Sequence, residues 1–274
     1  MKTWVNGTIL EAAESLISVY DHGLTVGDGV FETTKVVDGK PFALTRHLLR
    51  LQASARGLGL PDPDLDLVRH AVEDVLLENE TSAPLRLRIT YTGGVSPLGS
   101  DRGDSVPTLI VAVAPAKAWA PTSVLATVPW PRNEQAPTAG LKTTSYADNV
   151  IALAYAKARG AAEAVLANTA GYLCEGTGSN IFVVLGGEIV TPPLSSGCLA
   201  GVTRALVLEW VGGSERDLPM TALRDAEEIF LTSATRDVQG VQRVDHRDLA
   251  QAPGPVTRQA AEVFAQRAAE HIDP

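Results

Sequence analysis

The spacing of apolar residues predicts short strands and amphipathic helices in the first part of the chain. From Leu85 to Tyr91 every second residue is apolar, as in a strand that buries one face. Over residues 64–79 the apolar positions recur every three or four residues, which is typical of a helix packed on a core. Thr45 is expected to be the N-cap of another helix, whose apolar stripe runs from Leu48 to Leu58. Asn6-Gly7 predicts a hairpin at the beginning of the chain.

The second part of the chain is dominated by expected strands separated by tight turns. Strands are expected at residues 124–128, 164–167, 172–175, 181–184, 188–191 and 229–233, and helices at 149–158, 203–211 and 255–269. With so few helices between the strands, the pattern favours a β-rich, barrel-like domain over a Rossmann sheet. Because Pro115–Pro121 is the best linker, we expect an α/β protein with a small domain at residues 1–117, a linker at 118–121 and a larger domain at 122–274.

Composition and charge narrow the class of protein. A chain of 274 residues can form one large domain or two smaller ones, and its 45% hydrophobic content is that of a globular protein. The net charge of -9 disfavours a nucleic-acid partner. No apolar run approaches the roughly 18 residues that span a membrane, and the chain begins with an expected strand rather than a signal segment. We therefore expect a cytoplasmic protein that binds no metal, nucleic acid or membrane, with Cys174 and Cys198 as free, buried thiols.

Lys142 is one of only six lysines in the chain, against seventeen arginines. It lies between a loop rich in proline and glycine, residues 136–140, and the helix expected at 149–158. A lysine in such a loop is ordinarily a solvated surface residue, so its local setting alone assigns it no role. The wider pattern of the chain does.

Several short blocks occur in a characteristic order. They are Gly27–Thr33 (GDGVFET), Arg46–Leu51 (RHLLRL), Gly140–Asn149 (GLKTTSYADN), Glu175–Phe182 (EGTGSNIF) and Leu199–Arg204 (LAGVTR). In this order and spacing they resemble the class IV, or fold type IV, pyridoxal-phosphate enzymes. That family includes branched-chain aminotransferases, D-amino-acid transaminases and 4-amino-4-deoxychorismate lyases. The resemblance extends from about Trp4 to about Asp245.

The resemblance implies pyridoxal 5′-phosphate (PLP) as cofactor and a small two-layer N-terminal domain followed by a larger β-rich pseudo-barrel. It assigns Lys142 to the imine with the cofactor and to proton movement at the substrate, which a partly desolvated amine can perform. Glu175 matches the carboxylate that keeps the pyridine nitrogen protonated. Tyr146 matches the tyrosine directed at the phenolic oxygen; the alternative is a core tyrosine packed under the helix.

The cofactor's phosphate requires several hydrogen-bond donors. Arg50 matches the family's phosphate arginine, although a solvated helix arginine is the alternative. Val202-Thr203 opens an expected helix, whose free N–H groups and threonine hydroxyl suit an anion. A further phosphate-binding threonine of the family is replaced here by Ala234, and Ser233 or Thr235 could substitute for it.

The reaction and the stereochemistry of the substrate are not decided. The three possibilities are a D-amino-acid transaminase, a branched-chain L-amino-acid aminotransferase and an aminodeoxychorismate lyase. A transaminase moves an amino group between an amino acid and a 2-keto acid, whereas the lyase produces 4-aminobenzoate and pyruvate. Phe31-Glu32 resembles the transaminases more than the lyases, and the chain length is nearer to D-amino-acid transaminases than to branched-chain L-amino-acid enzymes. We favour a D-amino-acid transaminase.

This interpretation leaves the substrate's carboxylate without the family's usual ligands. The tyrosine, arginine and histidine that bind it in the well-known D-specific enzymes correspond here to Phe31, Leu98 and Ser100. Arg88 and Arg102 are therefore the candidate carboxylate ligands, beside Phe31 in the substrate site. The resemblance also implies a homodimer in which the loop equivalent to residues 93–102 reaches over the neighbouring subunit's cofactor.

Overall fold

The computed structural model describes residues 1–274, and its internal contacts divide the chain into two compact units. One unit contains Met1–Lys117, Leu141–Tyr146 and Ile272–Pro274, and the other contains Ala118–Gly140 and Ala147–His271. The expected division counted residues 141–146 with the second domain. They group with the first unit because their backbone pairs with a strand of that unit.

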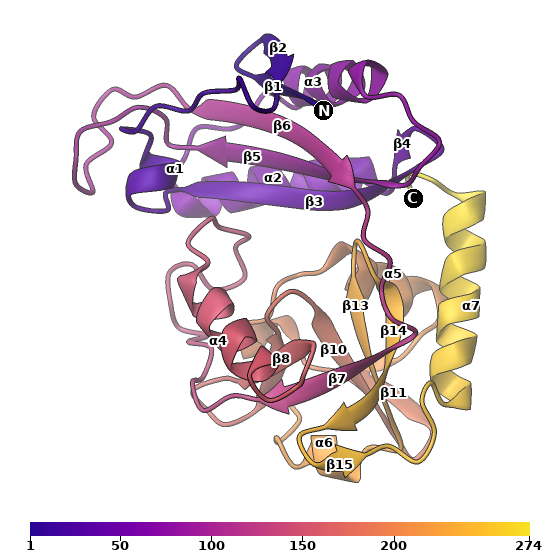
Figure 1. Cartoon of the computed structure of the whole chain (residues 1–274). Helices are drawn as coiled ribbons and strands as arrows, with labels where there is room; N and C mark the ends of the chain where they lie inside the picture. The colour runs from indigo at the N-terminus through magenta and orange to yellow at the C-terminus, as the bar shows by residue number, and fades with distance from the viewer. The chain divides into compact units, whose positions relative to one another are not determined.

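The first unit is a six-stranded sheet covered by two helices. The strand order is β2-β1-β6-β5-β3-β4, and every pair is antiparallel. The strands are β1 (Lys2–Val5), β2 (Thr8–Glu11), β3 (Gly29–Val37), β4 (Lys40–Pro41), β5 (Leu85–Thr92) and β6 (Thr108–Pro115). Helices α2 (Leu44–Leu58) and α3 (Leu65–Glu78) pack on one face of the sheet, and the short α1 (His22–Thr25) precedes β3 (Figure 1).

Alternation along β5 explains which residues form the core of this unit. Leu85, Leu87 and Ile89 are buried against α2 and α3, as their spacing predicts. The intervening Arg86 and Arg88 point to the opposite face, which we call the distal face. On the neighbouring strand β3, Phe31 shares the distal face with Arg88. Functional side chains can therefore lie on this face without disturbing the apolar core.

The expected N-cap of α2 is wrong. The helix begins at Leu44, and Ala43 is the N-cap residue in a left-handed conformation. Thr45 lies inside the first turn, where its N–H and hydroxyl donate to the Asp273 carboxylate at 2.8 and 2.6 Å. A carboxylate distant in sequence thus satisfies the helix terminus, which local sequence rules do not anticipate.

The second unit is built on a nine-stranded sheet. Its order is β12-β11-β10-β13-β14-β7-β8-β9, with β15 paired to β14. The strands are β7 (Thr122–Thr127), β8 (Glu163–Ala167), β9 (Leu173–Gly176), β10 (Asn180–Leu185), β11 (Glu188–Thr191), β12 (Ser214–Glu215), β13 (Glu228–Ser233), β14 (Asp237–Val244) and β15 (Arg247–Asp248). Because β9 also contacts β10, the sheet curls on itself, which confirms the expected β-rich barrel-like architecture.

Helices cover the outside of this curled sheet. Helix α7 (Pro255–Glu270) packs on β13, β14 and α5 (Val202–Trp210), whereas α4 (Ala147–Lys157) packs on β7 and β8 (Figure 1). Two short segments, η1 (Leu194–Ser196) and α6 (Ala222–Asp225), complete the unit. The sequence pattern did not predict β14, the short elements or α1. None of the helices combines the length and apolar character required to cross a bilayer.

Candidate functional site

The segment that carries Lys142 extends the sheet of the first unit. Thr143 forms an antiparallel bridge with Val30, on the edge of β3 opposite β5, where β4 pairs only with Val36 and Val37. The Lys142 carbonyl accepts a hydrogen bond from the Phe31 N–H at 2.9 Å, and the Lys142 N–H donates to the Ser54 hydroxyl at 3.2 Å. The lysine is therefore anchored by its backbone to both a strand and a helix, which fixes the origin of its side chain.

The Phe31 ring collects three side chains that sequence analysis selected. The Lys142 ammonium lies 4.4 Å from the ring centroid and the Arg88 guanidinium 3.6 Å from it. The Tyr146 ring meets Phe31 edge-on, with centroids 5.4 Å apart. Cations over an aromatic face are attracted by its quadrupole. The structure thus brings Phe31, Arg88, Lys142 and Tyr146 together on the distal face.

Arg88 has no carboxylate partner. Its only hydrogen bond runs from Nε to the Thr90 hydroxyl, at 3.3 Å. Burial lowers the pKa of its guanidinium from the usual range, and the neighbouring Tyr146 and Glu32 act in the opposite direction. A partly desolvated cation with unused donors is suited to bind an anion.

On the helix-covered face of the sheet, the Glu32 carboxylate of β3 lies between two basic side chains. Its carboxylate accepts two hydrogen bonds from Arg50, both at 2.7 Å, and lies 2.6 Å from Nδ1 of His47. Burial raises the pKa of Glu32, but Arg50 and His47 outweigh it and lower the pKa to about 2. This buried cluster holds Arg50 in a defined orientation on α2, because a bidentate pair fixes the plane of the guanidinium.

Arg102 is held differently from Arg88. Its guanidinium forms two hydrogen bonds of 2.6 Å with the Asp28 carboxylate and donates to the carbonyls of Leu58 and Gly59. The hydrogen bonds with Asp28 raise its pKa above the ordinary value. Most of its donors are therefore used within its own chain.

In the second unit, Glu175 is the centre of a polar cluster. Its Oε2 accepts a hydrogen bond from the Leu199 N–H at 2.9 Å, and its Oε1 lies 3.4 Å from Nε of Arg132. Arg132 also donates to Asn149 at 2.8 Å, and Asn149 donates to the Thr177 carbonyl at 2.6 Å. The carboxylate is buried and lies beside this cation.

The N-terminus of α5 fits an anionic ligand such as a phosphate. Its first residues, Val202 and Thr203, present N–H groups that have no partner within the helix. The Thr203 hydroxyl is buried without a hydrogen-bond partner. A Cβ at the N-cap residue Gly201 would lie 2.0 Å from Oδ1 of Asn180, so only glycine permits this close approach. The unsatisfied hydroxyl is the observation that favours a bound anion here.

The turn after β13 contains the other two residues selected for the phosphate. Ser233 and Thr235 are both half-buried, on either side of Ala234. The next residue, Arg236, donates to the buried Glu163 carboxylate at 2.8 Å and lies over the Trp119 ring. Glu163 in turn accepts a hydrogen bond from the Ser179 hydroxyl, so it ties this turn to the loop that follows Glu175.

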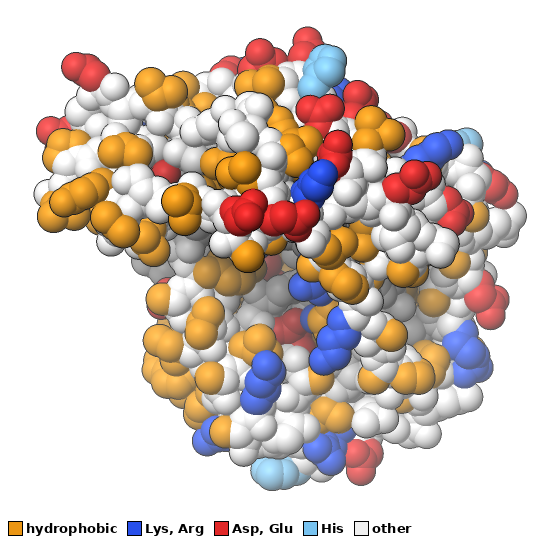
Figure 2. Space-filling model, turned by 45° about the horizontal axis from the view of Figure 1, so that its top comes forward, with side chains coloured by type: hydrophobic (Ala, Val, Ile, Leu, Met, Phe, Trp, Pro, Cys, Tyr) orange, Lys and Arg blue, Asp and Glu red, His pale blue; other side chains and the backbone are white.

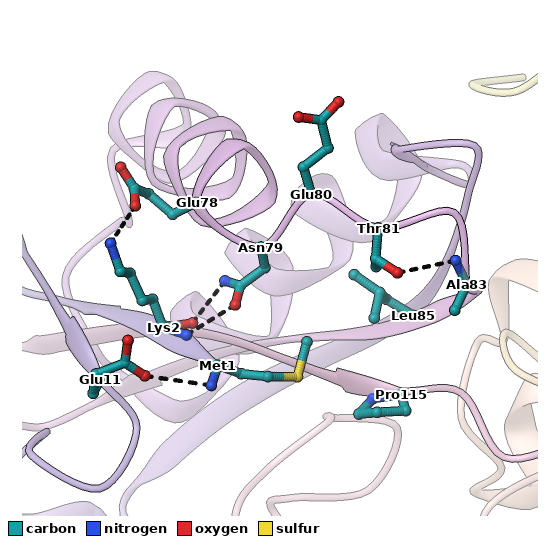
Figure 3. A pocket seen from close by; sticks show the side chains of 10 residues that line it. All are labelled: Met1, Lys2, Glu11, Glu78, Asn79, Glu80, Thr81, Ala83, Leu85 and Pro115. Atoms are coloured by element: carbon teal, nitrogen blue, oxygen red, sulfur yellow. Dashed lines mark hydrogen bonds and ion pairs between the residues drawn. The ribbon is translucent and has the colours of Figure 1, made fainter.

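A separate hollow lies on the first unit, away from these residues. It has a volume of about 460 Å³ and is lined by Met1, Lys2, Glu11, Glu78, Asn79, Glu80, Thr81, Ala83, Leu85 and Pro115. Figure 3 shows two ion pairs at its rim, the Lys2 ammonium with Glu78 and the N-terminus with Glu11. It contains none of the selected residues. No cluster of three metal-ligating side chains occurs in the structure, and both cysteines are free and buried.

Sequence analysis therefore identified some of the residues in the polar and charged clusters of both units. Within the first unit the structure groups Phe31, Arg88, Lys142 and Tyr146, and places Arg50 with Glu32; within the second it contains Glu175, Val202, Thr203, Ser233 and Thr235. The roles of Arg132, Asn149 and Glu163 were missed. Arg132 lies in a loop without periodicity, so nothing local distinguishes it. Glu32 carried a usable signal, a charge on the buried face of a strand.

Comparison with known proteins gives one family. A model of the family described as amino-transferase class IV matches residues 29–244. A putative branched-chain-amino-acid aminotransferase of Methanocaldococcus jannaschii is 32% identical, over 96% of this chain and 95% of that protein. A bifunctional aminodeoxychorismate lyase and D-amino acid transaminase of Mycobacterium tuberculosis is 31% identical, over 97% of this chain and 96% of that protein.

Solved structures agree with these relatives. The PLP-bound form of a hypothetical aminotransferase from Mycobacterium tuberculosis superimposes with a TM-score of 0.88. The two sequences are 30% identical, and the match covers 97% of this chain and 98% of the other. The two folds therefore correspond over almost the entire length of both chains.

Proposed function

The chain belongs to the class IV aminotransferases, and we propose that it moves an amino group between a D-amino acid and a 2-keto acid. The expected fold type IV architecture, the aminotransferase activity and the PLP cofactor are confirmed by the family match and by similar PLP-bound structures. The choice of a D-amino acid goes beyond this. It is supported by the likeness to the Mycobacterium tuberculosis protein whose name includes D-amino acid transaminase.

We assign the cofactor contacts by residue. Lys142 would attach the cofactor, Tyr146 would serve its phenolic oxygen, and Glu175 would serve its pyridine nitrogen. Arg50, the first turn of α5 at Val202-Thr203, and the hydroxyls of Ser233 and Thr235 would hold its phosphate. The unpartnered Thr203 hydroxyl and the fixed guanidinium of Arg50 support the assignment of the phosphate site.

When bound, PLP supplies an electron sink for the charge that develops at the substrate's Cα. The chain's contribution is a base at that carbon, and we give this role to Nζ of Lys142. Its backbone hydrogen bonds to Phe31 and Ser54 fix where the side chain begins, and the Phe31 ring lies beside the ammonium. Such positioning keeps Nζ within reach of a proton without reorganisation.

The observation that carries the substrate proposal is Arg88, a half-buried cation without a carboxylate partner, which lies with Lys142 on the Phe31 ring. An amino acid brings an α-carboxylate that must leave water, and an unpaired buried carboxylate is strongly disfavoured. Arg88 lies on the same Phe31 ring as the catalytic amine and has donors to spare. We assign the α-carboxylate to Arg88 and the adjoining wall of the substrate site to Phe31.

A parallel assay tests the choice of substrate. The purified protein with PLP is given D-alanine or L-leucine with 2-oxoglutarate, and aminodeoxychorismate without an acceptor. We expect pyruvate from D-alanine at the highest rate. Faster formation of the keto acid of leucine would favour the branched-chain alternative. Formation of 4-aminobenzoate as the main reaction would favour the lyase, which the name of the Mycobacterium tuberculosis relative also includes.

We further propose that the protein is a homodimer. Exposed apolar side chains concentrate on two neighbouring segments of the first unit, joined by backbone hydrogen bonds from His22 to Gly94 and from Ser96 to Tyr20. Figure 2 shows apolar side chains gathered at the left edge, where Figure 1 places α1. The exposed apolar residues of these segments are Leu16, Ile17, Val19, Tyr20, Leu24, Val26, Val95, Leu98 and Val106.

A patch of this kind marks an association surface, and a second copy of the chain is the occupant that the family resemblance implies. Sedimentation velocity of the wild type should give a dimer, and Leu24→Asp should shift it toward monomer. Leu77→Asp, on an exposed residue of α3 outside the patch, is the control and should not. An active monomer at assay concentration would contradict the proposal. The cytoplasmic location and the absence of nucleic-acid and membrane partners stay predictions.

A further inference from the structure

Asp28 lies between two glycines, and its side chain contacts the loop that follows β5. Both carboxylate oxygens accept hydrogen bonds from Arg102 at 2.6 Å. The site is built to fit the carboxylate, because a Cβ at Gly93 would lie only 2.4 Å from Oδ2 of Asp28. The Asp28 side chain is 11% exposed, whereas that of Arg102 is 31% exposed, so the carboxylate is the shielded member of the pair.

The backbone on either side of Asp28 contacts the segment that carries Lys142. The Gly27 carbonyl accepts hydrogen bonds from the hydroxyls of Thr144 and Ser145, both at 2.9 Å. The Gly29 carbonyl accepts from the Thr144 N–H at 2.8 Å. Gly27 has a positive φ of 69°, and a Cβ there would lie 2.7 Å from the Ser145 hydroxyl, so this approach requires glycine.

The loop of residues 93–102 is thereby fastened at both ends. At its beginning, the Gly93 N–H donates to the Asp28 carbonyl, and the His22 imidazole donates to the Pro97 carbonyl at 2.8 Å. At its end, Arg102 is bound to Asp28 and to the carbonyls of Leu58 and Gly59. Only the tip is unconstrained, and Leu98 there is 74% exposed.

We propose that Asp28 and Arg102 are positioning residues that hold this loop in register with the segment carrying Lys142. In this arrangement Arg102 acts through Asp28 and does not itself bind the substrate's carboxylate, which Arg88 receives. The inference rests on the proposed transaminase function, because the loop matters for catalysis only if Lys142 is the reacting amine. The placement of a loop relative to a reacting group strongly affects the reaction rate, since a misplacement of about 1 Å can reduce that rate roughly a hundredfold.

The test uses the holoenzyme with Asp28→Asn, Arg102→Met, the double variant and the milder Arg102→Lys. The matched control is the exposed pair Arg56–Asp62, which has the same two-bond geometry at 2.7 and 2.6 Å, changed to Arg56→Met and Asp62→Asn. Two quantities are measured. One is the rate of thermolysin cleavage within residues 93–106, mapped by mass spectrometry, and the other is kcat/KM for D-alanine and for 1-phenylethylamine, which lacks a carboxylate.

We expect each single variant to raise the cleavage rate several-fold and to lower kcat/KM about tenfold or more for both substrates. The double variant should be no worse than either single one, because both remove the same interaction. Arg102→Lys should be intermediate, and the control variants should match the wild type.

Two results would overturn the inference. If Arg102→Met lost D-alanine alone while Asp28→Asn kept it, Arg102 would be a carboxylate ligand. If neither variant altered cleavage or kinetics, the pair would position nothing. Should the wild type transaminate neither substrate, the proposed function fails, and the cleavage rates still decide whether Asp28 and Arg102 fasten the loop. A variant that fails to fold is replaced in both measurements by Arg102→Lys.

Discussion

The two faces of the six-stranded sheet differ in how their charged side chains are paired. On the helix-covered face, Glu32 is matched by Arg50 and His47, so the carboxylate and its cations neutralise one another. On the distal face, one residue away along β3, the Phe31 ring carries Arg88 and Lys142, and Arg88 has no carboxylate partner. A cation that is left unpaired after folding retains its capacity to bind an anion. The comparison therefore separates a carboxylate that is neutralised within the fold, Glu32, from a cation without a carboxylate partner, Arg88, to which we assign the substrate.

The energetics of the two faces differ for the same reason. Glu32 is almost fully buried, and its pKa of about 2 shows that the favourable interactions with Arg50 and His47 exceed the cost of desolvation. Arg88 experiences the burial without an equal compensation, so its pKa falls. Binding an anionic substrate would supply that compensation, because it would place a negative charge beside the partly desolvated guanidinium.

The largest effect is expected from Lys142→Ala, which removes the reacting amine of the distal face. Turnover should fall by on the order of 10³-fold or more, because proton transfer and the covalent attachment of the cofactor are both lost. The visible absorbance of the bound cofactor should change with it. Lys40→Ala, an exposed lysine of β4, is the control and should be silent. Full activity of Lys142→Ala without an added amine would refute the assignment.

A smaller effect, on the free energy of unfolding, is expected from Glu32→Gln on the helix-covered face. A pKa that folding lowers from 4.5 to about 2 corresponds to a stabilisation of about 3 kcal/mol. The free energy of unfolding from urea denaturation should fall by about that amount at neutral pH. Asp62→Asn, in the exposed pair with Arg56, should change it little, because solvent screens that pair.

The same carboxylate gives the stability a defined pH dependence. Because its pKa is lowered by folding, the contribution of Glu32 is fully present above about pH 4.5 and is lost as the pH falls toward 2. The stability difference between the wild type and Glu32→Gln should therefore be largest at neutral pH and shrink below pH 4.5. A difference that stays constant down to pH 3 would show that the ion pair is not its origin.

The smallest effect is expected at the N-terminus of α5, from Thr203→Val. Loss of one hydrogen bond to a charged group costs about 1.5–3 kcal/mol, so PLP should bind roughly tenfold or more weakly. Thr257→Val is a matched control, since its hydroxyl is also buried and unpartnered in the first turn of a helix, α7. Equal loss of PLP affinity in both variants would argue against a phosphate contact at Thr203.

Local patterns predicted much of the fold because each has a direct physical cause. The alternation from Leu85 to Tyr91 reports the two faces of β5, and the apolar spacing over residues 64–79 corresponds to α3. Asn6-Gly7 forms the expected hairpin with positive φ at both residues. The resemblance, carried by blocks such as GDGVFET, identified the family, the fold and the cofactor.

What sequence could not predict depends on contacts between distant segments. The Asp273 carboxylate, instead of Thr45, satisfies the start of α2, and Arg132 reaches Glu175 from an irregular loop. The distinction between Arg88 and Arg102 was also invisible, because both are arginines of one strand and its loop. Only the structure shows that Arg102 is bound by the Asp28 carboxylate, whereas Arg88 has no carboxylate partner.

The central claim, that the unpaired cation of the distal face receives the substrate's carboxylate, is tested most directly with Arg88→Leu. The measurement compares kcat/KM for D-alanine and for 1-phenylethylamine, with Arg86→Leu, two residues earlier on the same face of β5, as the control. Loss of a charge-assisted contact of about 1.5–3 kcal/mol should reduce kcat/KM for D-alanine roughly tenfold to a hundredfold and spare the amine. An equal loss for both substrates, or no loss for either, would contradict the account.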